Sequence, residues 1–169
     1  KQKPTSLELV LYAKMGIGDG TYANVSWLQE LPDPVSKIVW DNYLMTSPKL
    51  AQKMGWRQGH MIRVKSKTGE IVAPVFIQPG VSENVLGLAI GYGRKNAGKV
   101  GTGVGVNAYP MAGWQNGRII TSGISIEVEK TEIPYELATT QNHNMLRDPK
   151  IEKTDRALIA ETPNEAFAQ

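Results

Sequence analysis

The sequence contains no cysteine, which excludes disulfides, thiolate-ligated iron–sulfur clusters and cysteine-type zinc sites within this chain. It has two histidines, His60 and His143, which stand far apart and have no acidic or histidine neighbours at ligand spacing, so no metal site is predicted. No apolar run approaches the roughly 20 residues that span a bilayer. We therefore expect no direct membrane insertion.

A large excess of one charge sign is also missing. The 19 basic and 16 acidic residues give a net charge of +3 and are scattered along the chain, so no nucleic-acid partner is expected. With 41% hydrophobic residues in 169, the chain can bury one core. It does not begin with methionine, and we expect a segment of a longer protein.

What the sequence does contain is a series of short strand patterns between glycines and prolines. They cover residues 7–13, 37–41, 60–78 as a hairpin turning at "KTGE", 84–93 and 117–131. One helix is clearly predicted, in "TSPKLAQKMGW": Ser47 can cap it, Pro48 suits its first position and Gly55 ends it. Several strands with one such helix indicate a small barrel rather than alternating α/β units.

A long connection, residues 14–37, follows the first strand. Its glycines and prolines allow only a short turn of helix at "NVSWLQEL", with Asn24 or Ser26 as the N-cap. Connections of this length are more often functional or interface-forming than idle.

The stretch "GYGRKNAGKVGTGVGVNAYP", residues 91–110, comes close to a phosphate-binding loop. Such a loop needs a hydroxyl after its lysine and a helix behind it. Here Val100 follows Lys99, and glycines alternate up to Gly105, so no helix is expected. We interpret the stretch as a structural or interface loop.

No set of nucleophile, base and acid can be assembled, because Ser47 is explained by capping. No catalytic residue is therefore predicted, and the chain is not expected to be catalytic by itself. The tryptophans are more informative. Trp27 and Trp114 fall in loops, where aromatic residues often anchor an interface, although packing onto their own barrel explains them about as well.

The ordered pieces from "VWDNYLMTSPKLAQKMGW" to "LGLAIGYG", and then "VNAYP", resemble the C-terminal molybdopterin-dinucleotide-binding domain of molybdopterin oxidoreductases. The resemblance implies a mainly β fold, a six-stranded double-psi β barrel with one or two short helices and long loops. It assigns residues 1–132 to the barrel and 133–169 to a polar connector toward a following iron–sulfur domain that is absent from this chain.

Three further motifs, "YANVSWLQELPDPVSKIVWDN", "GYGRKNAGKVGTGVGVNAYPM" and "ATTQNHNML", resemble the iron–sulfur subunit of alternative complex III, a Tat-variant-translocated molybdopterin oxidoreductase. This implies a quinol-oxidising respiratory complex on the periplasmic side of the bacterial inner membrane. The partners would be other domains of the parent chain and neighbouring subunits, and iron–sulfur clusters would lie in the downstream domain.

The resemblance leaves two readings of the cofactor open. In the first, the barrel is a cofactor-free structural and docking module, because the long loop lacks the histidine and threonines that cofactor-bearing relatives display. In the second, it binds molybdopterin guanine dinucleotide. The positions near the cofactor in those relatives match Trp40, Asn42 and Asn107. The interface candidates are Trp27, Arg94, Tyr109, Trp114 and His143. A peptide-binding barrel of the kind found in ATPase adaptors is a third, less favoured reading.

Overall fold

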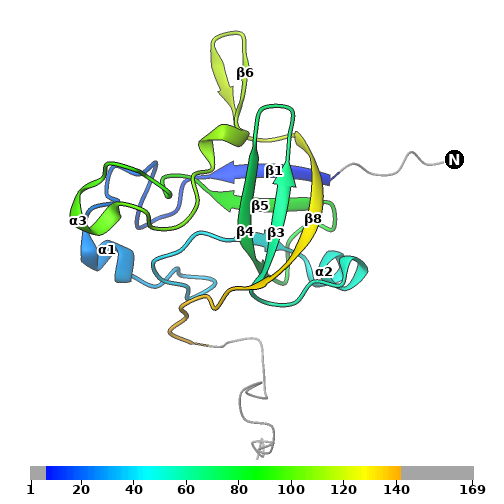
Figure 1. The fold of residues 1–169 in the computed structure, drawn as a ribbon, viewed down its shortest axis with the longest axis horizontal. Helices are drawn as coiled ribbons and strands as arrows, with labels where there is room; N and C mark the ends of the chain where they lie inside the picture. Colours follow the sequence, from blue (N-terminus) through cyan, green and yellow to red (C-terminus); the bar gives the residue numbers. More distant parts are fainter. Residues whose placement is uncertain (1–6, 142–169) are drawn as a thin grey trace, which may run out of the picture.

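The computed structural model describes residues 7–141. Six strands close into a barrel: β1 (Leu7–Tyr12), β2 (Leu44–Thr46), β3 (His60–Lys65), β4 (Glu70–Ile77), β5 (Val85–Ala89) and β8 (Ile124–Pro134). Their order around the barrel is β1-β5-β2-β4-β3-β8 (Figure 1). The β1–β5 and β2–β4 pairs are parallel and the other four are antiparallel. The expected mainly β, six-stranded barrel is confirmed.

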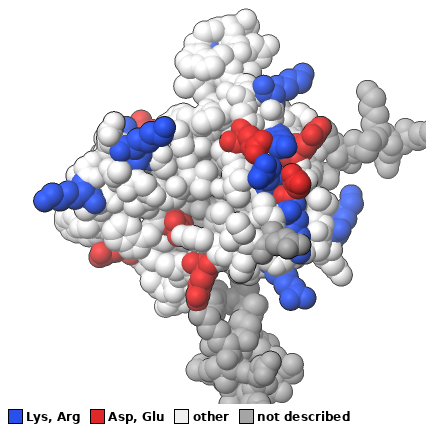
Figure 2. Space-filling view, in the orientation of Figure 1, with Lys and Arg blue, Asp and Glu red and all other residues white. Residues whose placement is uncertain are grey.

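The barrel interior is filled by the alternate residues of its strands, because successive side chains of a strand point to opposite faces. Leu9 and Leu11 of β1, Ile62 and Val64 of β3 and Leu86 of β5 are all buried in one cluster. Arg63 and Lys65, which alternate with Ile62 and Val64 in β3, lie near Glu70 of β4 on the outer face. Figure 2 shows this mixed row of charges over β3, β4 and β8.

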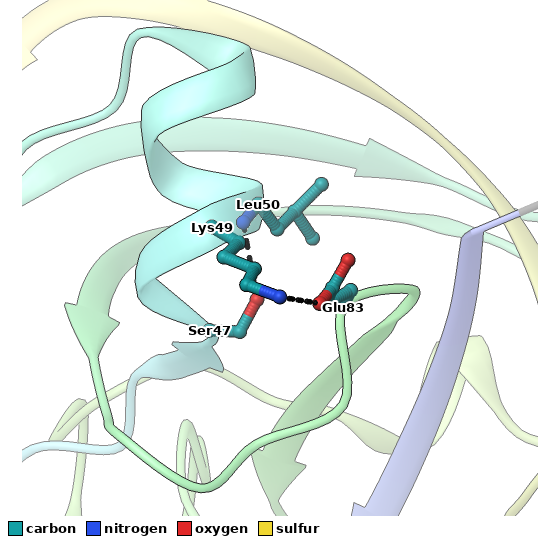
Figure 3. Close-up of polar contacts among 4 residues, drawn as sticks. All are labelled: Ser47, Lys49, Leu50 and Glu83. Carbon is teal, nitrogen blue, oxygen red and sulfur yellow. Dashed lines mark hydrogen bonds and ion pairs between the residues drawn. The ribbon is translucent and has the colours of Figure 1, made fainter.

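Helix α2 (Pro48–Met54) covers one end of the barrel, as predicted. The Ser47 hydroxyl accepts a hydrogen bond from Leu50 N at 3.1 Å, Pro48 occupies the first position, and Gly55 ends the helix in the left-handed region. The exposed ammonium of Lys49 also meets Glu83 at 2.6 Å (Figure 3). Capping thus fixes the helix start, since the hydroxyl satisfies an N–H that has no partner within the helix.

The predicted strand at residues 37–41 is wrong. Lys37 and Trp40 have positive φ values, 61° and 66°, which a pleated strand does not allow. The segment contributes only an isolated bridge between Ile38 and Thr139, and the strand that enters the barrel is β2, further along. The bridge, with Leu137 packed in the Ile38 cluster, also attaches the start of the expected connector to the barrel, and β8 itself runs to Pro134.

Two further expectations are corrected at the opposite end of the barrel. Helix α1 (Ser26–Glu30) forms as predicted, but its N-cap is Val25 and no side chain caps it. A single helical turn, α3 (Gly98–Gly101), forms where none was expected. Both facts have one cause: the Asn24 side chain turns to α3, where Oδ1 accepts hydrogen bonds from Val100 N at 3.0 Å and Gly101 N at 3.4 Å.

A short arm of two strands lies outside the barrel. A 3₁₀ turn (Tyr109–Met111) leads into β6 (Gly113–Gln115), which pairs only with β7 (Arg118–Ile120), and the arm projects from the barrel in Figure 1. The single strand expected over residues 117–131 is therefore divided between β7 and β8. No helix in the described part of the chain is long and apolar enough to cross a membrane.

Candidate functional site

A groove of about 920 Å³ lies between the two long loops at the α1–α3 end of the barrel. One wall comes from the loop after β1, at residues 19–24, and the other from the glycine loop after β5, at residues 92–97; Asn107 and Tyr109 complete the lining. We call residues 14–43 and 90–109 the loop cap. Because β1 and β5 are parallel neighbours, their following loops leave the same edge of the barrel and meet there.

Hydrogen bonds between residues far apart in the sequence hold the groove open. Arg94 Nη1 donates to the Gly20 carbonyl at 2.5 Å, and the Tyr109 hydroxyl donates to the Asp19 carbonyl at 3.0 Å. Glycine is required where the loops touch: a Cβ on Gly91 would lie 2.5 Å from Gly20 N. The two walls are therefore positioned by each other and by the barrel beneath them.

The lining mixes polar and apolar groups and carries more positive than negative charge. Arg94 and Lys95 stand against the single carboxylate of Asp19, and hydrogen bonds from Thr21 lower the pKa of that carboxyl. The side-chain amides of Asn96 and Asn107 add donors and acceptors. Two cations with neutral amides suit a ligand that carries phosphate and a heterocycle.

The helical turn at α3 does not make the groove a phosphate-binding loop. A phosphate would need free N–H groups at the start of a helix, whereas Asn24 Oδ1 already takes the N–H groups of Val100 and Gly101. The helix also ends after four residues. The loop is therefore no phosphate-binding loop, as predicted; of the two reasons given for this, the missing hydroxyl at Val100 holds, whereas the expected absence of a helix was wrong.

The residues proposed to face a cofactor do not come together. Asn107 lines the groove, where its Oδ1 accepts from Tyr109 N at 3.1 Å. Trp40 is half-buried and does not line it. Asn42 is 1% exposed, and both of its amide hydrogens go to carbonyls, those of Ala89 and Val106, at 2.8 Å each.

Asn42 is therefore a structural residue, and its interpretation as facing a ligand is corrected. Its Oδ1 also accepts from Val106 N at 2.8 Å, so one side chain ties the end of β5 to the backbone just before Asn107. Nothing in the sequence distinguishes an amide that faces a ligand from one that joins two loops, because both need the same donors and acceptors.

The interface candidates are placed in three different ways. Arg94 and Tyr109 line the groove. Trp27 and Trp114 are 77% and 73% exposed, which decides against their packing onto the barrel. Trp114 stands opposite Ile119 on the β6–β7 arm, and Ile119 is exposed too. His143 lies outside the described residues.

Sequence reasoning missed Asp19, Asn24 and Lys95 as groove residues. For the wall formed by residues 92–97, the sequence did offer a signal, namely the basic pair at 94–95 between a glycine and an asparagine in "GRKN". No signal marks the first wall, because nothing in the sequence pairs residue 19 with residue 109. Within residues 7–141, no group of three or more histidine, aspartate or glutamate side chains is arranged to hold a metal ion.

Comparisons with known proteins agree with the fold. Residues 20–157 match the model of a family described as "Molydopterin dinucleotide binding domain". The chain is 29% identical over 65 residues to the thiosulfate reductase molybdopterin-containing subunit PhsA of Salmonella typhimurium, a match that covers 38% of this chain and 9% of that protein. It also resembles the solved structure of acetylene hydratase from Pelobacter acetylenicus, with a TM-score of 0.55, 17% identity, and coverage of 75% of this chain and 18% of that one. The chain thus spans less than a fifth of either relative.

Proposed function

Because the chain belongs to the molybdopterin dinucleotide binding domain family, we propose that it holds the dinucleotide part of a molybdopterin cofactor as one domain of a larger molybdenum oxidoreductase. The observation that supports this most directly is the groove of about 920 Å³, whose lining includes the cations of Arg94 and Lys95 and the amides of Asn96 and Asn107. The match to a subunit named as molybdopterin-containing supports it as well. These findings favour cofactor binding over the cofactor-free reading.

The residues present fit such a ligand by their chemistry. Arg94 and Lys95 would hold the phosphates, since guanidinium and ammonium groups bind phosphate through charge-assisted hydrogen bonds. The amides of Asn96 and Asn107 would face the nucleoside, because an amide can match both donors and acceptors of a base. When bound, the metal centre of the cofactor supplies the redox chemistry, while this chain supplies binding and orientation.

Calorimetric titration of the 169-residue chain with GDP and CDP tests the proposal. We expect one of the two to bind in the groove, and the stronger ligand identifies the nucleotide of the cofactor. Lys95→Gln should weaken binding several-fold and reduce its dependence on salt. Arg94→Ala should weaken it about 10- to 100-fold, as expected for a charged hydrogen bond worth about 1.5–3 kcal/mol.

Lys49→Gln is the matched control, because Lys49 is an exposed lysine on α2 and does not line the groove. It should leave nucleotide affinity unchanged. Two results would contradict the assignment of the groove to the nucleotide. One is that neither GDP nor CDP binds, and the other is that Lys95→Gln and Arg94→Ala bind the nucleotide as tightly as the wild type does.

A second candidate function is favoured by the exposed aromatic residues. Trp27 and Trp114 are large apolar side chains left in solvent, which supports a docking role between domains or subunits. In this reading the chain is a structural module of a quinol-oxidising complex of the alternative complex III type, periplasmic, with iron–sulfur clusters in a following domain. Its partners would be the other domains of the parent protein and neighbouring respiratory subunits.

Pterin analysis of the intact parent complex separates the two candidates. Oxidative release of a fluorescent pterin in stoichiometric amount supports the molybdenum enzyme. A complex that oxidises quinol without releasing pterin, and that loses subunits when Trp114→Ser is introduced, supports the docking module.

A further inference from the structure

A second cavity, of about 200 Å³, lies on the other side of the loop after β1. It is lined by residues 14–17, by the α1 residues Leu28 and Gln29, by residues 31–34, and by Tyr92. Of the described residues, only Tyr92 lines both cavities. The proposed cofactor groove makes no use of its polar groups.

Lys14 contributes a buried ammonium group to this cavity. The side chain is 8% exposed, and Nζ donates to the Asp41 carbonyl at 3.3 Å and lies 5.3 Å from the ring centre of Tyr43. No carboxylate of the described residues lies within 4.0 Å of it. Because an ammonium group has three donors, Lys14 keeps donor capacity for a further acceptor.

Gln29 contributes a buried acceptor to the same cavity. It is 2% exposed, and its Nε2 donates to the Ala23 carbonyl at 2.8 Å, which fixes the orientation of the amide. Within residues 7–141, its Oε1 has no hydrogen-bond partner. Such an atom is rare in folded proteins and costs about 1–3 kcal/mol, so a ligand that donates to it would recover that cost.

The charge around the cavity favours a neutral occupant. Asp33 lines the cavity together with Lys14, and its carboxylate is held by the N–H groups of Val35 and Ser36 at 3.0 and 2.9 Å. One ammonium and one carboxylate leave no net charge to attract an anion. A primary carboxamide is neutral, and it offers an acceptor for Lys14 and donors for Gln29.

The surroundings of the cavity indicate that this carboxamide belongs to a polypeptide. Met15 and Leu31, which line it, are 79% and 47% exposed, and nearby Val35 is 62% exposed. Exposed apolar side chains around a polar pocket are typical of a protein interface. As one domain of the larger oxidoreductase proposed above, the chain would have polypeptide neighbours that could supply this carboxamide.

We propose that the Lys14–Gln29 cavity receives the side-chain carboxamide of an asparagine or glutamine from a polypeptide partner, whose flanking apolar residues pack on Met15 and Leu31. This makes the loop after β1 a two-sided element, with the cofactor groove on one side and a docking pocket on the other. The proposal does not depend on what the groove binds.

Binding of short blocked peptides, followed by NMR, tests the proposal. The probe is a leucine–glutamine–leucine peptide with an acetyl group and an N-methylamide end, so that its only primary carboxamide is the side chain. We expect it to shift the Gln29 side-chain amide and Met15 methyl signals. Peptides with methionine or glutamate at the centre should bind at least about 10-fold more weakly, and this comparison needs no variant of the protein.

Variants then separate the polar pocket from the apolar rim. Lys14→Met should weaken binding of the glutamine peptide at least about 10-fold. Met15→Ser should weaken binding of the peptide but not binding of free propionamide, which has no flanking side chains. Lys49→Met and Met54→Ser, on the distant helix α2, are matched controls and should change neither.

Three results would overturn the proposal. The first is tighter binding of the glutamate peptide, which would make the site one for carboxylates. The second is equal affinity for propionamide and the peptide, which would make it a small-molecule site. The third is the absence of any shift of the Gln29 or Met15 signals at saturating peptide, which would leave the cavity to water alone.

Discussion

The barrel and the loop cap are stabilised in different ways. In the barrel, alternate apolar residues of neighbouring strands bury one cluster that includes Leu9, Ile62 and Leu86. In the loop cap, a small apolar cluster that includes Ile17 and Tyr92 is joined by polar contacts between distant segments, such as that of the Tyr109 hydroxyl with the Asp19 carbonyl over 90 positions. The cap therefore combines a smaller core with individual polar residues, whereas the barrel depends on the pattern of its strands.

This difference explains why the cap can carry a site. Apolar packing is non-directional and tolerates exchange of similar residues, so it builds a support without specifying a ligand. Hydrogen bonds between loops hold the backbone in place, because they form only over a narrow range of distances and angles. The groove lies where such hydrogen bonds join the two loops of the cap, and Lys14 and Gln29 of the second cavity are held by carbonyls within the first of these loops.

The largest effect is expected where two cap segments touch through a glycine. Gly93 has φ of 65°, and a Cβ there would lie 2.1 Å from Asn107 N. Gly93→Ala should lower the free energy of unfolding by about 4 kcal/mol or more, since the clash adds to the strain of a left-handed backbone. Urea unfolding followed by fluorescence measures it.

Gly103→Ala is the matched control within the same loop. Gly103 has a similar φ of 76°, but a Cβ there meets nothing within 4 Å. We expect a loss of about 1–2 kcal/mol from backbone strain alone. Equal losses in the two variants would show that contact between the segments contributes nothing.

A somewhat smaller loss is expected from Asn42→Ala. The change removes three hydrogen bonds and leaves the buried Ala89 carbonyl and the part-buried Val106 carbonyl without their donor, for a cost of about 3 kcal/mol. Leu86→Ala in the barrel should cost about 2–5 kcal/mol but leave nucleotide affinity unchanged in the folded protein.

Asn42→Ala therefore tests the contacts of the loop cap, and Leu86→Ala tests the packing of the barrel. Asn42→Ala should weaken GDP or CDP binding in the same titration, because Asn107 loses the anchor of its neighbour Val106. A loss of stability below about 1 kcal/mol for Asn42→Ala, with unchanged nucleotide affinity, would contradict the structural role of its amide.

The smallest effect is a change in pH dependence. Burial lowers the pKa of Lys14 below the ordinary lysine value of 10.5, against the opposing charges of Asp33 and Asp41. Between that lowered pKa and 10.5 the unfolded chain binds more protons, so stability rises with pH. The penalty is fully present below the folded-state pKa and disappears as pH approaches 10.5.

Lys14→Met should therefore flatten the rise in unfolding free energy as pH increases toward about 10. Measurement stops there because burial raises the pKa of Tyr12 to about 12, so that stability falls with further increase in pH as the unfolded chain loses its tyrosine protons. Lys65→Met, on the outer face of β3, is the control. An unchanged slope in Lys14→Met would mean that the amine is solvated in the folded protein.

Prediction from sequence succeeded where neighbouring residues decide the structure. The alternation in β3 and the Ser47–Pro48 helix start are local patterns, and both were confirmed. It failed at residues 37–41, whose apolar letters favour a strand, because Lys37 and Trp40 take positive φ in the folded chain. It also placed Asn42 among the positions that would face a cofactor, and it overlooked Asp19 and Lys95.

The sequence by itself determined the barrel and its helix, because alternation and capping act between residues a few positions apart. It also contained the family pattern and the cations of the glycine loop. Only the tertiary structure decided the contacts within the loop cap. Asn24 accepts hydrogen bonds from α3, Asn42 joins two loops, and Lys14 and Gln29 line one cavity. Those outcomes depend on contacts between distant segments, which exist only once the parallel strands β1 and β5 bring their loops to one edge.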